Sequence, residues 1–393
     1  MRDKYAVTKI SCYIGFVVQA IINNFLPILF VALQDIYGLG YEKLARLIVI
    51  NFGTQIIIDL CAPFVLKKVG YRWSSALSQA TAAAGLILLG VLPNVISNTY
   101  FAISVSAVIY AVGSGLMEVI LSPLVENIPS NNKTGSMAIT HSFYCWGQAF
   151  TIIVTTILIS FIGFNGWNYI PLIWAVIPLI NSLLFSKVPM VNPPADEKLA
   201  SFKELFKRRN FRGYMVMMIC AGASEIAIAQ WASMFVQKGL GVDKVIGDLA
   251  GPCAFALCMA SARVIYGINA KKIDFKKLLM ILSVAAFICY MGVALVPNAV
   301  ISLIFCAVCG FAVSVSWPGT YSSAAKDFPD GGAVMYGVFA CCGDLGCAFG
   351  PWVLGIVADK FNLNVGFGVV SLFAVVMFVV TALTLKSVEK CNN

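Results

Sequence analysis

Long apolar blocks are the feature that most restricts how this chain folds. Of its 393 residues, 60% are hydrophobic and only 11% are charged, whereas ordinary soluble domains are roughly 25% charged. Each block has about 20 residues or more, enough for a helix to cross about 30 Å of hydrocarbon. Because a backbone in lipid must satisfy its hydrogen bonds internally, we expect every block to be helical. The predicted transmembrane helices span residues 8–33, 43–66, 73–92, 98–127, 134–162, 165–186, 211–237, 246–268, 275–295, 297–325, 333–358 and 363–386.

Two short sequences in the first half of the chain return in the second half. Residues 38–43 (GLGYEK) correspond to 239–244 (GLGVDK), and residues 67–72 (KKVGYR) correspond to 271–276 (KKIDFK). Such a duplication is typical of secondary transporters, whose substrate site lies between the two copies. We therefore predict an all-α membrane protein with twelve transmembrane helices in two pseudo-symmetric six-helix bundles, and solute transport as its leading function.

The predicted boundary between the halves is a polar interval. Apolar residues at Leu199, Phe202, Leu205 and Phe206, with lysines and arginines on the opposite face, predict a short amphipathic helix at the membrane surface. The resulting units are an N-terminal bundle at 1–186, a cytoplasmic linker at 187–210 and a C-terminal bundle at 211–393.

The net charge of +9 is distributed as a topology signal. Most of the lysines and arginines fall in loops on the same side as both termini, including the loops near Lys67 and Arg263 and the central linker. Basic residues in short loops mark the cytoplasmic side, so both termini are expected there. The positive charge is therefore explained by topology and does not indicate a nucleic-acid partner.

Acidic residues within the predicted helices are unexpected, because an ionisable group there costs roughly 2.5–3.5 kcal/mol on insertion scales, and four of them have polar neighbours at helical spacing or lie near the bilayer centre. They are Asp59, Glu118, Glu225 and Asp344. Residues of this kind usually face a cavity or a partner inside the bundle. We expect Glu118, Glu225 and Asp344 to be candidates for proton coupling.

Polar and aromatic residues accompany these acids at helical spacing, which places them on shared faces. Apolar ring faces next to hydrogen-bonding groups suit a sugar-like solute. The competing interpretations are that His141 is a satisfied core histidine and that the tryptophans are packing or interface anchors. The candidates for the substrate cavity are Asn23, Asn24, Gln55, His141, Gln148, Gln230, Trp231 and Trp317.

A cytoplasmic gate is predicted around Asp59. Its neighbours Lys67 and Arg72 suggest either a structural ion pair or a role in transport. Arg263, near the end of the eighth predicted helix, is expected to extend to the interface or to pair with an acid, with direct contact to the substrate as the alternative, and it joins the gate candidates.

The duplicated halves, the basic loops and the segment 63–72 (PFVLKKVGYR) together resemble the major facilitator superfamily. The segment is similar to that superfamily's signature between helices 2 and 3, but Lys67 occupies a position where an acid is usual. The resemblance therefore implies a rearranged gate that uses Asp59. The resemblance covers nearly the whole chain and implies a multi-pass protein of the cell (inner) membrane.

Within the superfamily, the chain resembles the fucose permease branch of proton-coupled sugar symporters. Residues 118–123 (EVILSP) reproduce that branch's fourth-helix Glu followed by Pro, which implies that Glu118 takes part in proton coupling and sugar binding. Phe143 and Gly147 match its fifth helix, whereas His141 stands where the branch carries Gln. Asn23 stands where it carries a second acid, so either Glu118 works with Glu225 or Asp344, or the carrier is not proton-driven.

The predicted function is secondary active transport of a small polar solute, a sugar or related metabolite, by alternating access with proton symport. Two alternatives remain: proton-linked efflux of drug-like or amphipathic compounds, and a non-transporting membrane receptor. An enzyme is not expected, because no metal-ligand cluster, no nucleophile partner for the single histidine and no phosphate-binding glycine loop are apparent. The expected partners are the solute, protons and the lipid bilayer, with no cofactor and a monomeric state.

Overall fold

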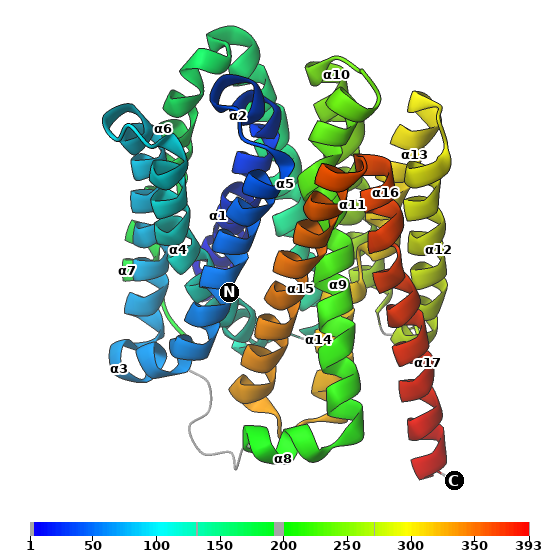
Figure 1. The fold of residues 1–393 in the computed structure, drawn as a ribbon. Helices are drawn as coiled ribbons and strands as arrows, with labels where there is room; N and C mark the ends of the chain where they lie inside the picture. Colours follow the sequence, from blue (N-terminus) through cyan, green and yellow to red (C-terminus); the bar gives the residue numbers. More distant parts are fainter. Residues whose placement is uncertain (1–3, 131–132, 192–199, 271, 393) are drawn as a thin grey trace.

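The computed structural model describes residues 4–130, 133–191, 200–270 and 272–392, and these residues form an all-α protein (Figure 1). Twelve of its helical segments are long and apolar enough to cross a membrane, as the hydrophobic blocks predict. The helices are α1 (Ala6–Ile28), α2 (Phe30–Tyr37), α3 (Tyr41–Val95), α4 (Thr99–Asn127), α5 (Lys133–Ile162), α6 (Ile170–Trp174), α7 (Val176–Lys187), α8 (Phe202–Lys207), α9 (Arg209–Met234), α10 (Lys244–Asp248), α11 (Ala254–Asn269), α12 (Phe275–Leu295), α13 (Ala299–Val313), α14 (Ser316–Asp327), α15 (Gly332–Lys360), α16 (Leu363–Val370) and α17 (Leu372–Asn392).

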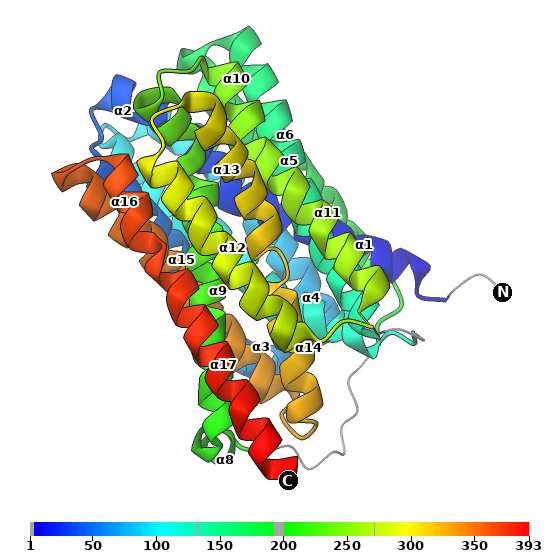
Figure 2. The ribbon, with the colours of Figure 1, turned by 90° about the vertical axis from the view of Figure 1, so that its right-hand side faces the viewer.

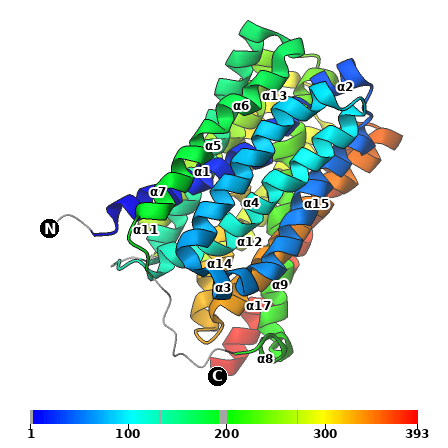
Figure 3. The same cartoon turned by 90° about the vertical axis from the view of Figure 1, so that its left-hand side faces the viewer.

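The helices form two bundles that stand next to each other. Figure 1 shows α1 to α7 on one side and α9 to α17 on the other, with α8 at the lower end. Between the bundles, α11 packs on α5 and α15 packs on α3. Figures 2 and 3 show that the long helices of each bundle run in similar tilted directions. We call the end that carries α8 the linker end, and the end that carries α2 and α10 the far end.

Several predicted helices are interrupted or joined in the structure. The segment 67–72, predicted as a loop, is helical except at Gly70, whose φ of 77° bends α3 at the linker end. Residues with a Cβ rarely adopt this φ, so glycine is suited to the bend. The tenth predicted helix, 297–325, is divided between α13 and α14.

The division of the tenth helix has a chemical cause in Pro318. Proline has no N–H, so Pro318 cannot donate to the carbonyl of Ser314 four residues earlier. In the same way, Pro27 inside α1 cannot donate to the carbonyl of Asn23. Both carbonyl oxygens therefore need donors from elsewhere, because a buried unpaired carbonyl is costly.

The helices α9 and α15 pack backbone against backbone. A Cβ placed on Gly346 would lie 2.0 Å from the carbonyl oxygen of Ile219, and one on Gly222 would lie 2.2 Å from that of Gly343. Real side chains do not approach this closely, so both positions require glycine. Close packing is therefore what these glycines provide here, rather than a break in α15, which continues through Pro351 to Lys360.

The linker contributes the short helix α8, which forms where the amphipathic pattern predicts it. Ser201 and Glu204 form a reciprocal capping box at its start. Arg208 donates two hydrogen bonds, of 2.8 and 2.5 Å, to the carboxylate of Asp330 in the α14–α15 connection. Leu205 is buried against the protein. Leu199, part of the predicted pattern, lies outside the described residues.

Candidate functional site

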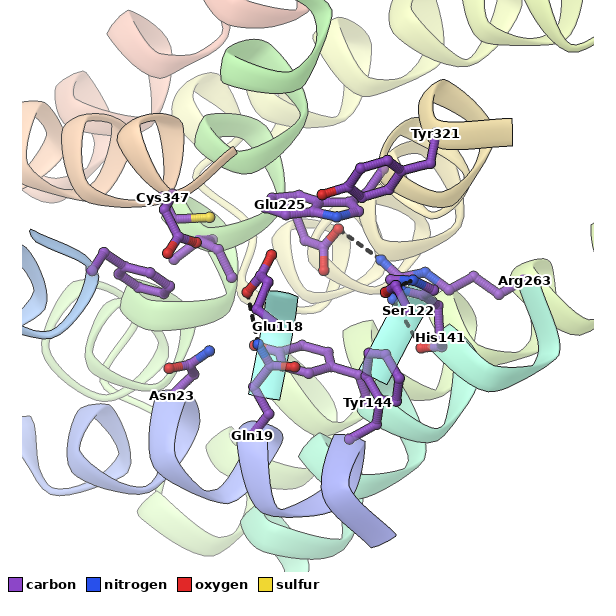
Figure 4. Close-up of a pocket in the computed structure, with 15 residues that line it drawn as sticks. Gln19, Asn23, Glu118, Ser122, His141, Tyr144, Glu225, Arg263, Tyr321 and Cys347 are labelled. Carbon is purple, nitrogen blue, oxygen red and sulfur yellow. Dashed lines mark hydrogen bonds and ion pairs between the residues drawn. The ribbon is translucent and has the colours of Figure 1, made fainter. Parts of the chain in front are cut away.

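A pocket lies between the two bundles near the middle of the helices (Figure 4). The space between its lining side chains is about 530 Å³, a volume that includes space open to solvent. Helices α1, α3, α4 and α5 supply one wall, and α9, α11, α14 and α15 supply the other. The lining residues are Phe16, Gln19, Asn23, Phe52, Glu118, Ser122, His141, Tyr144, Glu225, Ile226, Arg263, Trp317, Tyr321, Asp344 and Cys347.

All three predicted proton-coupling residues line this pocket, but their partners differ. Glu118 on α4 accepts a 2.7 Å hydrogen bond from the side-chain amide of Gln19 on α1, a neutral donor. One carboxylate oxygen of Asp344 has no hydrogen-bond partner among the described residues. Glu225 on α9, by contrast, forms a 2.7 Å ion pair with Arg263 on α11. Among the described residues, Glu118 and Asp344 therefore have no cationic partner.

Arg263 lies in the central pocket, not at the predicted cytoplasmic gate. Besides Glu225, its guanidinium donates to the carbonyl of Ser314 at 2.8 Å and to the carbonyl of His141 at 3.1 Å. The Ser314 carbonyl is the one that Pro318 leaves without a donor. Three oxygens, from α9, α5 and the turn between α13 and α14, compensate the burial of this charge, which is why Arg263 need not extend to the interface.

His141 and Trp317 occupy the pocket as predicted candidates for the substrate cavity. The Nε2 atom of His141 lies 3.3 Å from the hydroxyl oxygen of Ser122, within hydrogen-bond distance. Its ring lies against Phe16, with ring centroids 4.8 Å apart, and faces Tyr321 across the two bundles at 6.4 Å. His141 therefore presents a polar edge and an aromatic face to the same space.

Asn23 lines the pocket, and the predicted residues Asn24 and Gln55 support it from behind. The side-chain oxygen of Asn23 accepts hydrogen bonds from Asn51 at 2.9 Å and from Gln55 at 3.2 Å. Asn24 donates to the hydroxyl of Tyr144 at 3.3 Å. These five side chains position one another through hydrogen bonds, and only Asn23 and Tyr144 among them line the pocket, where a ligand could bind.

Three other cavity candidates lie outside the pocket lining. Trp231 is fully buried, donates to the carbonyl of Pro351 at 3.0 Å and packs near Phe30, so it is a packing anchor rather than a cavity residue. Gln230 donates at 2.6 Å to the carbonyl of Asn23 that Pro27 leaves unpaired. Gln148 is buried, and neither atom of its side-chain amide has a partner in the described part of the chain.

The predicted ion pair of Asp59 is not present in the structure. Neither of its carboxylate oxygens has a hydrogen-bond partner within the described ranges, and the side chain is 2% exposed. Arg72 instead donates at 2.9 Å to the carbonyl of Ser186, because the bend at Gly70 turns the second arm of α3 toward α7. Lys67 is exposed at the linker end.

A second cavity of about 510 Å³ lies on the linker side of the pocket, and Tyr321 lines both cavities. Glu126, Lys326 and Tyr336 are among its other walls. The ring of Tyr321 stacks on that of Tyr336, with centroids 5.3 Å apart and an interplanar angle of 29°. Tyr321 is therefore the partition between the pocket and this vestibule.

The far end is closed by a buried cluster around Asp248, which is absent from the predicted site residues. Its carboxylate forms a 2.8 Å ion pair with Lys244 and accepts hydrogen bonds from Ser233 and, at 2.9 Å, from Thr156 of the first bundle. Lys244 also donates to the carbonyl of Ile28 at 3.0 Å. We call these four side chains the far-end latch. The sequence feature that could have identified Asp248 is its position as an acid inside the predicted helix 246–268.

The fold and a polar pocket enclosed by two bundles define a membrane carrier. The sequence matches the Major Facilitator Superfamily over residues 12–351, and the chain belongs to that superfamily. No curated protein sequence matches it.

Solved structures with the same fold cover nearly the whole chain. A variant of the E. coli fucose:proton symporter FucP is 18% identical, with a TM-score of 0.72 and coverage of 97% of this chain and 99% of the symporter. The human organic anion transporter MFSD10 (TETRAN) is 14% identical, with a TM-score of 0.72 over 97% of this chain and 100% of that chain. A bacterial homologue of the human lysosomal transporter Spinster, inward-facing and occupied, is 11% identical with a TM-score of 0.75, covering 98% of both chains. At these identities the likeness establishes the fold.

Proposed function

We propose that this protein is a secondary active transporter that moves a small polar solute, a sugar or a related metabolite, together with protons. The observation that carries the proposal is the pocket itself, whose two walls belong to different bundles. A relative rotation of the bundles opens such a pocket to one side or the other, which is alternating access.

The two ends of the molecule differ in how they are closed. At the far end, the latch and an ion pair between Lys238 and Asp35 join the bundles directly. On the linker side, the vestibule leads to Tyr321, a single aromatic partition. We assign this conformation to a state that faces the linker end and is occluded by Tyr321.

The linker end is assigned to the cytoplasm. Lys67, Lys68 and the linker lysines and arginines gather there, whereas the far end has few basic residues. The protein is accordingly proposed to be a multi-pass protein of the cell (inner) membrane with both termini cytoplasmic.

The pocket combines hydrogen-bonding side chains with aromatic faces. Gln19, Asn23 and Ser122 offer polar groups, while Trp317 and Tyr321 offer ring faces. A pyranose has hydroxyls at its edges and apolar ring faces, so it matches both features. The FucP likeness supports the same solute class.

The geometry favours Glu118 over Glu225 as the proton carrier. Protonating Glu225 would leave the buried guanidinium of Arg263 without its counter-ion, which is strongly unfavourable. Glu118 has only a neutral donor, so its gain of a proton leaves no charge uncompensated. The neutral carboxyl then permits the dry, occluded state that its ionised form disfavours.

The proposal is tested with the purified protein in proteoliposomes. A panel of radiolabelled sugars is offered at two pH values, with and without an imposed proton gradient. We expect gradient-driven accumulation of at least one sugar, and we expect Glu118→Gln to retain exchange of that sugar but not to accumulate it. Accumulation by Glu118→Gln at the wild-type level contradicts the coupling role, and an absence of sugar flux in the wild type contradicts the function.

A further inference from the structure

Asp59 is a buried acid that the solute pocket does not use. It lies on α3, one helical turn beyond Gln55 toward the bend at Gly70, and is therefore closer to the linker end than Phe52, the residue of α3 in the pocket wall. Both of its carboxylate oxygens lack hydrogen-bond partners among the described residues, and the side chain is 2% exposed. An ionised carboxylate in these surroundings is costly, because the side chain is almost fully buried and no donor among the described residues compensates its charge.

The hydroxyl of Ser114 on α4 donates at 2.8 Å to Gln55 on α3, and one helical turn further along both packed helices Glu118 lies next to Asp59. Four titratable groups from three helices interact electrostatically with Asp59: Glu118 on α4, Asp344 and Cys341 on α15, and Tyr321 on α14. All four groups are neutral or acidic. Asp344 is 1% exposed and also has an unpartnered carboxylate oxygen.

This arrangement places Asp59, which lies outside the pocket, close to Glu118, which lines it. Glu118 and Asp344 line the solute pocket, whereas Asp59 does not. The solute has a separate way toward the linker end, through the vestibule beyond Tyr321. Asp59 lies on α3, which packs on α15, and it lines neither the pocket nor the vestibule, whereas a proton needs only a chain of carboxyl groups.

We propose that Asp59 carries the coupled proton between the central pocket and the linker end, by a route separate from that of the solute. This inference rests on the proposed proton-coupled function. In the transfer step, the O–H bond of the protonated Glu118 breaks and an O–H bond forms at the Asp59 carboxylate. The sum of the two charges is unchanged, so the step creates no additional charge inside the protein. Asp59 then releases the proton to water at the linker end.

The first test measures transport by Asp59→Asn in proteoliposomes. We expect solute affinity and solute exchange within about two-fold of the wild type, because the pocket lining is intact, and loss of gradient-driven accumulation. Asp59→Glu restores a titratable carboxyl and should recover part of the accumulation. Glu42→Gln, an exposed acid at the start of the same helix, is the matched control and should behave as the wild type.

Two transport results contradict the inference. One is proton-driven accumulation by Asp59→Asn at the wild-type level. The other is a loss of solute affinity of ten-fold or more in Asp59→Asn, since this would place Asp59 in solute binding.

The second test uses no solute and therefore separates this inference from the proposed function. Infrared difference spectra on a pH jump should contain a band from a protonated carboxyl that is missing in Asp59→Asn and present in Asp344→Asn. An unchanged band in Asp59→Asn contradicts the assignment to Asp59. Absence of sugar flux in the wild type, with the Asp59 band present, contradicts the proposed function instead.

Discussion

Arg263 donates to the carbonyl of Ser314, at 2.8 Å, in place of the N–H that Pro318 lacks. The same guanidinium holds Glu225 and the carbonyl of His141 on the opposite bundle. One side chain therefore stabilises a helix break, neutralises a pocket acid and links the two bundles.

Removing this guanidinium should destabilise the protein strongly. Arg263→Ala leaves Glu225 buried without its counter-ion, and we expect a loss of about 3–5 kcal/mol. Thermal unfolding in detergent measures it. The double variant Arg263→Met/Glu225→Gln should be less destabilised than Arg263→Ala, because no buried charge is left unpaired. Arg46→Ala, which removes an exposed ion pair with Glu42, should cost only about 0–1 kcal/mol.

The hydrogen bond from Gln230 to the Asn23 carbonyl should depend on Pro27. Gln230→Ala leaves that carbonyl unpaired, at an expected cost of about 1–3 kcal/mol. Adding Pro27→Ala supplies a backbone N–H four residues later, so the double variant should recover part of the loss. A thermal-unfolding cycle of the four proteins measures the coupling, and strictly additive effects would argue against this explanation.

The far-end latch should control access from the far side. Asp248→Asn removes the charge that holds Lys244 and weakens the link to Thr156. In a background where Cys347 is the single cysteine, we expect several-fold faster labelling of this pocket thiol by an impermeant maleimide added at the far side. Asp35→Asn, which breaks only the exposed pair with Lys238, should have a smaller effect. Equal labelling rates in both variants would rule out the latch.

Tyr321 should set access from the linker side. Tyr321→Ala joins the vestibule to the pocket, so Cys347 should react several-fold faster with a maleimide added at the linker end. Tyr321→Phe retains the ring and its stacking on Tyr336, and its labelling rate should stay near that of the wild type. If Tyr321→Phe labels as fast as Tyr321→Ala, the ring is not the partition.

Docking of α8 should weaken in acid. Hydrogen bonds from Ser201 lower the pKa of Glu204, and hydrogen bonds from Arg208 lower the pKa of Asp330. Because both pKa values are lower in the folded state, the stabilisation is present above the ordinary carboxyl pKa of roughly 4 and is lost as the pH falls through the folded-state values. Hydrogen exchange of the α8 amides, corrected for intrinsic pH dependence, should show protection falling over that range. In Asp330→Asn we expect low protection already at neutral pH.

The twelve helices were predictable because a membrane span depends on local composition. The same reasoning found Glu118, Glu225 and Asp344, since an acid within an apolar block has few places to face. Which polar residues meet is a different question, because the answer depends on how the bundles pack. His141 and Trp231 both have polar neighbours in the sequence, yet only His141 reaches the pocket.

Arg263 and Asp248 show where sequence patterns give insufficient information. The position of Arg263 near a helix end suggested that it extends to the interface or pairs with an acid; it pairs with Glu225, but nothing in the sequence pattern indicated the carbonyl freed by Pro318, 51 residues away in the chain. Asp248 pairs with Lys244 at i,i+4 spacing, but its other partners come from α5 and α9, which no local spacing indicates. The ion pair predicted for Asp59 failed for a related reason, because a single positive φ at Gly70 redirects Arg72.

The contact of α9 and α15 through Gly222 and Gly346 has a consequence for how this chain can evolve. With backbone atoms in the space that a methyl group would need, even alanine is excluded at both positions. Neighbouring positions can exchange one apolar side chain for another, but at these two positions no residue other than glycine fits. Descendants of this sequence that keep the fold should therefore diversify around an unchanging pair of glycines.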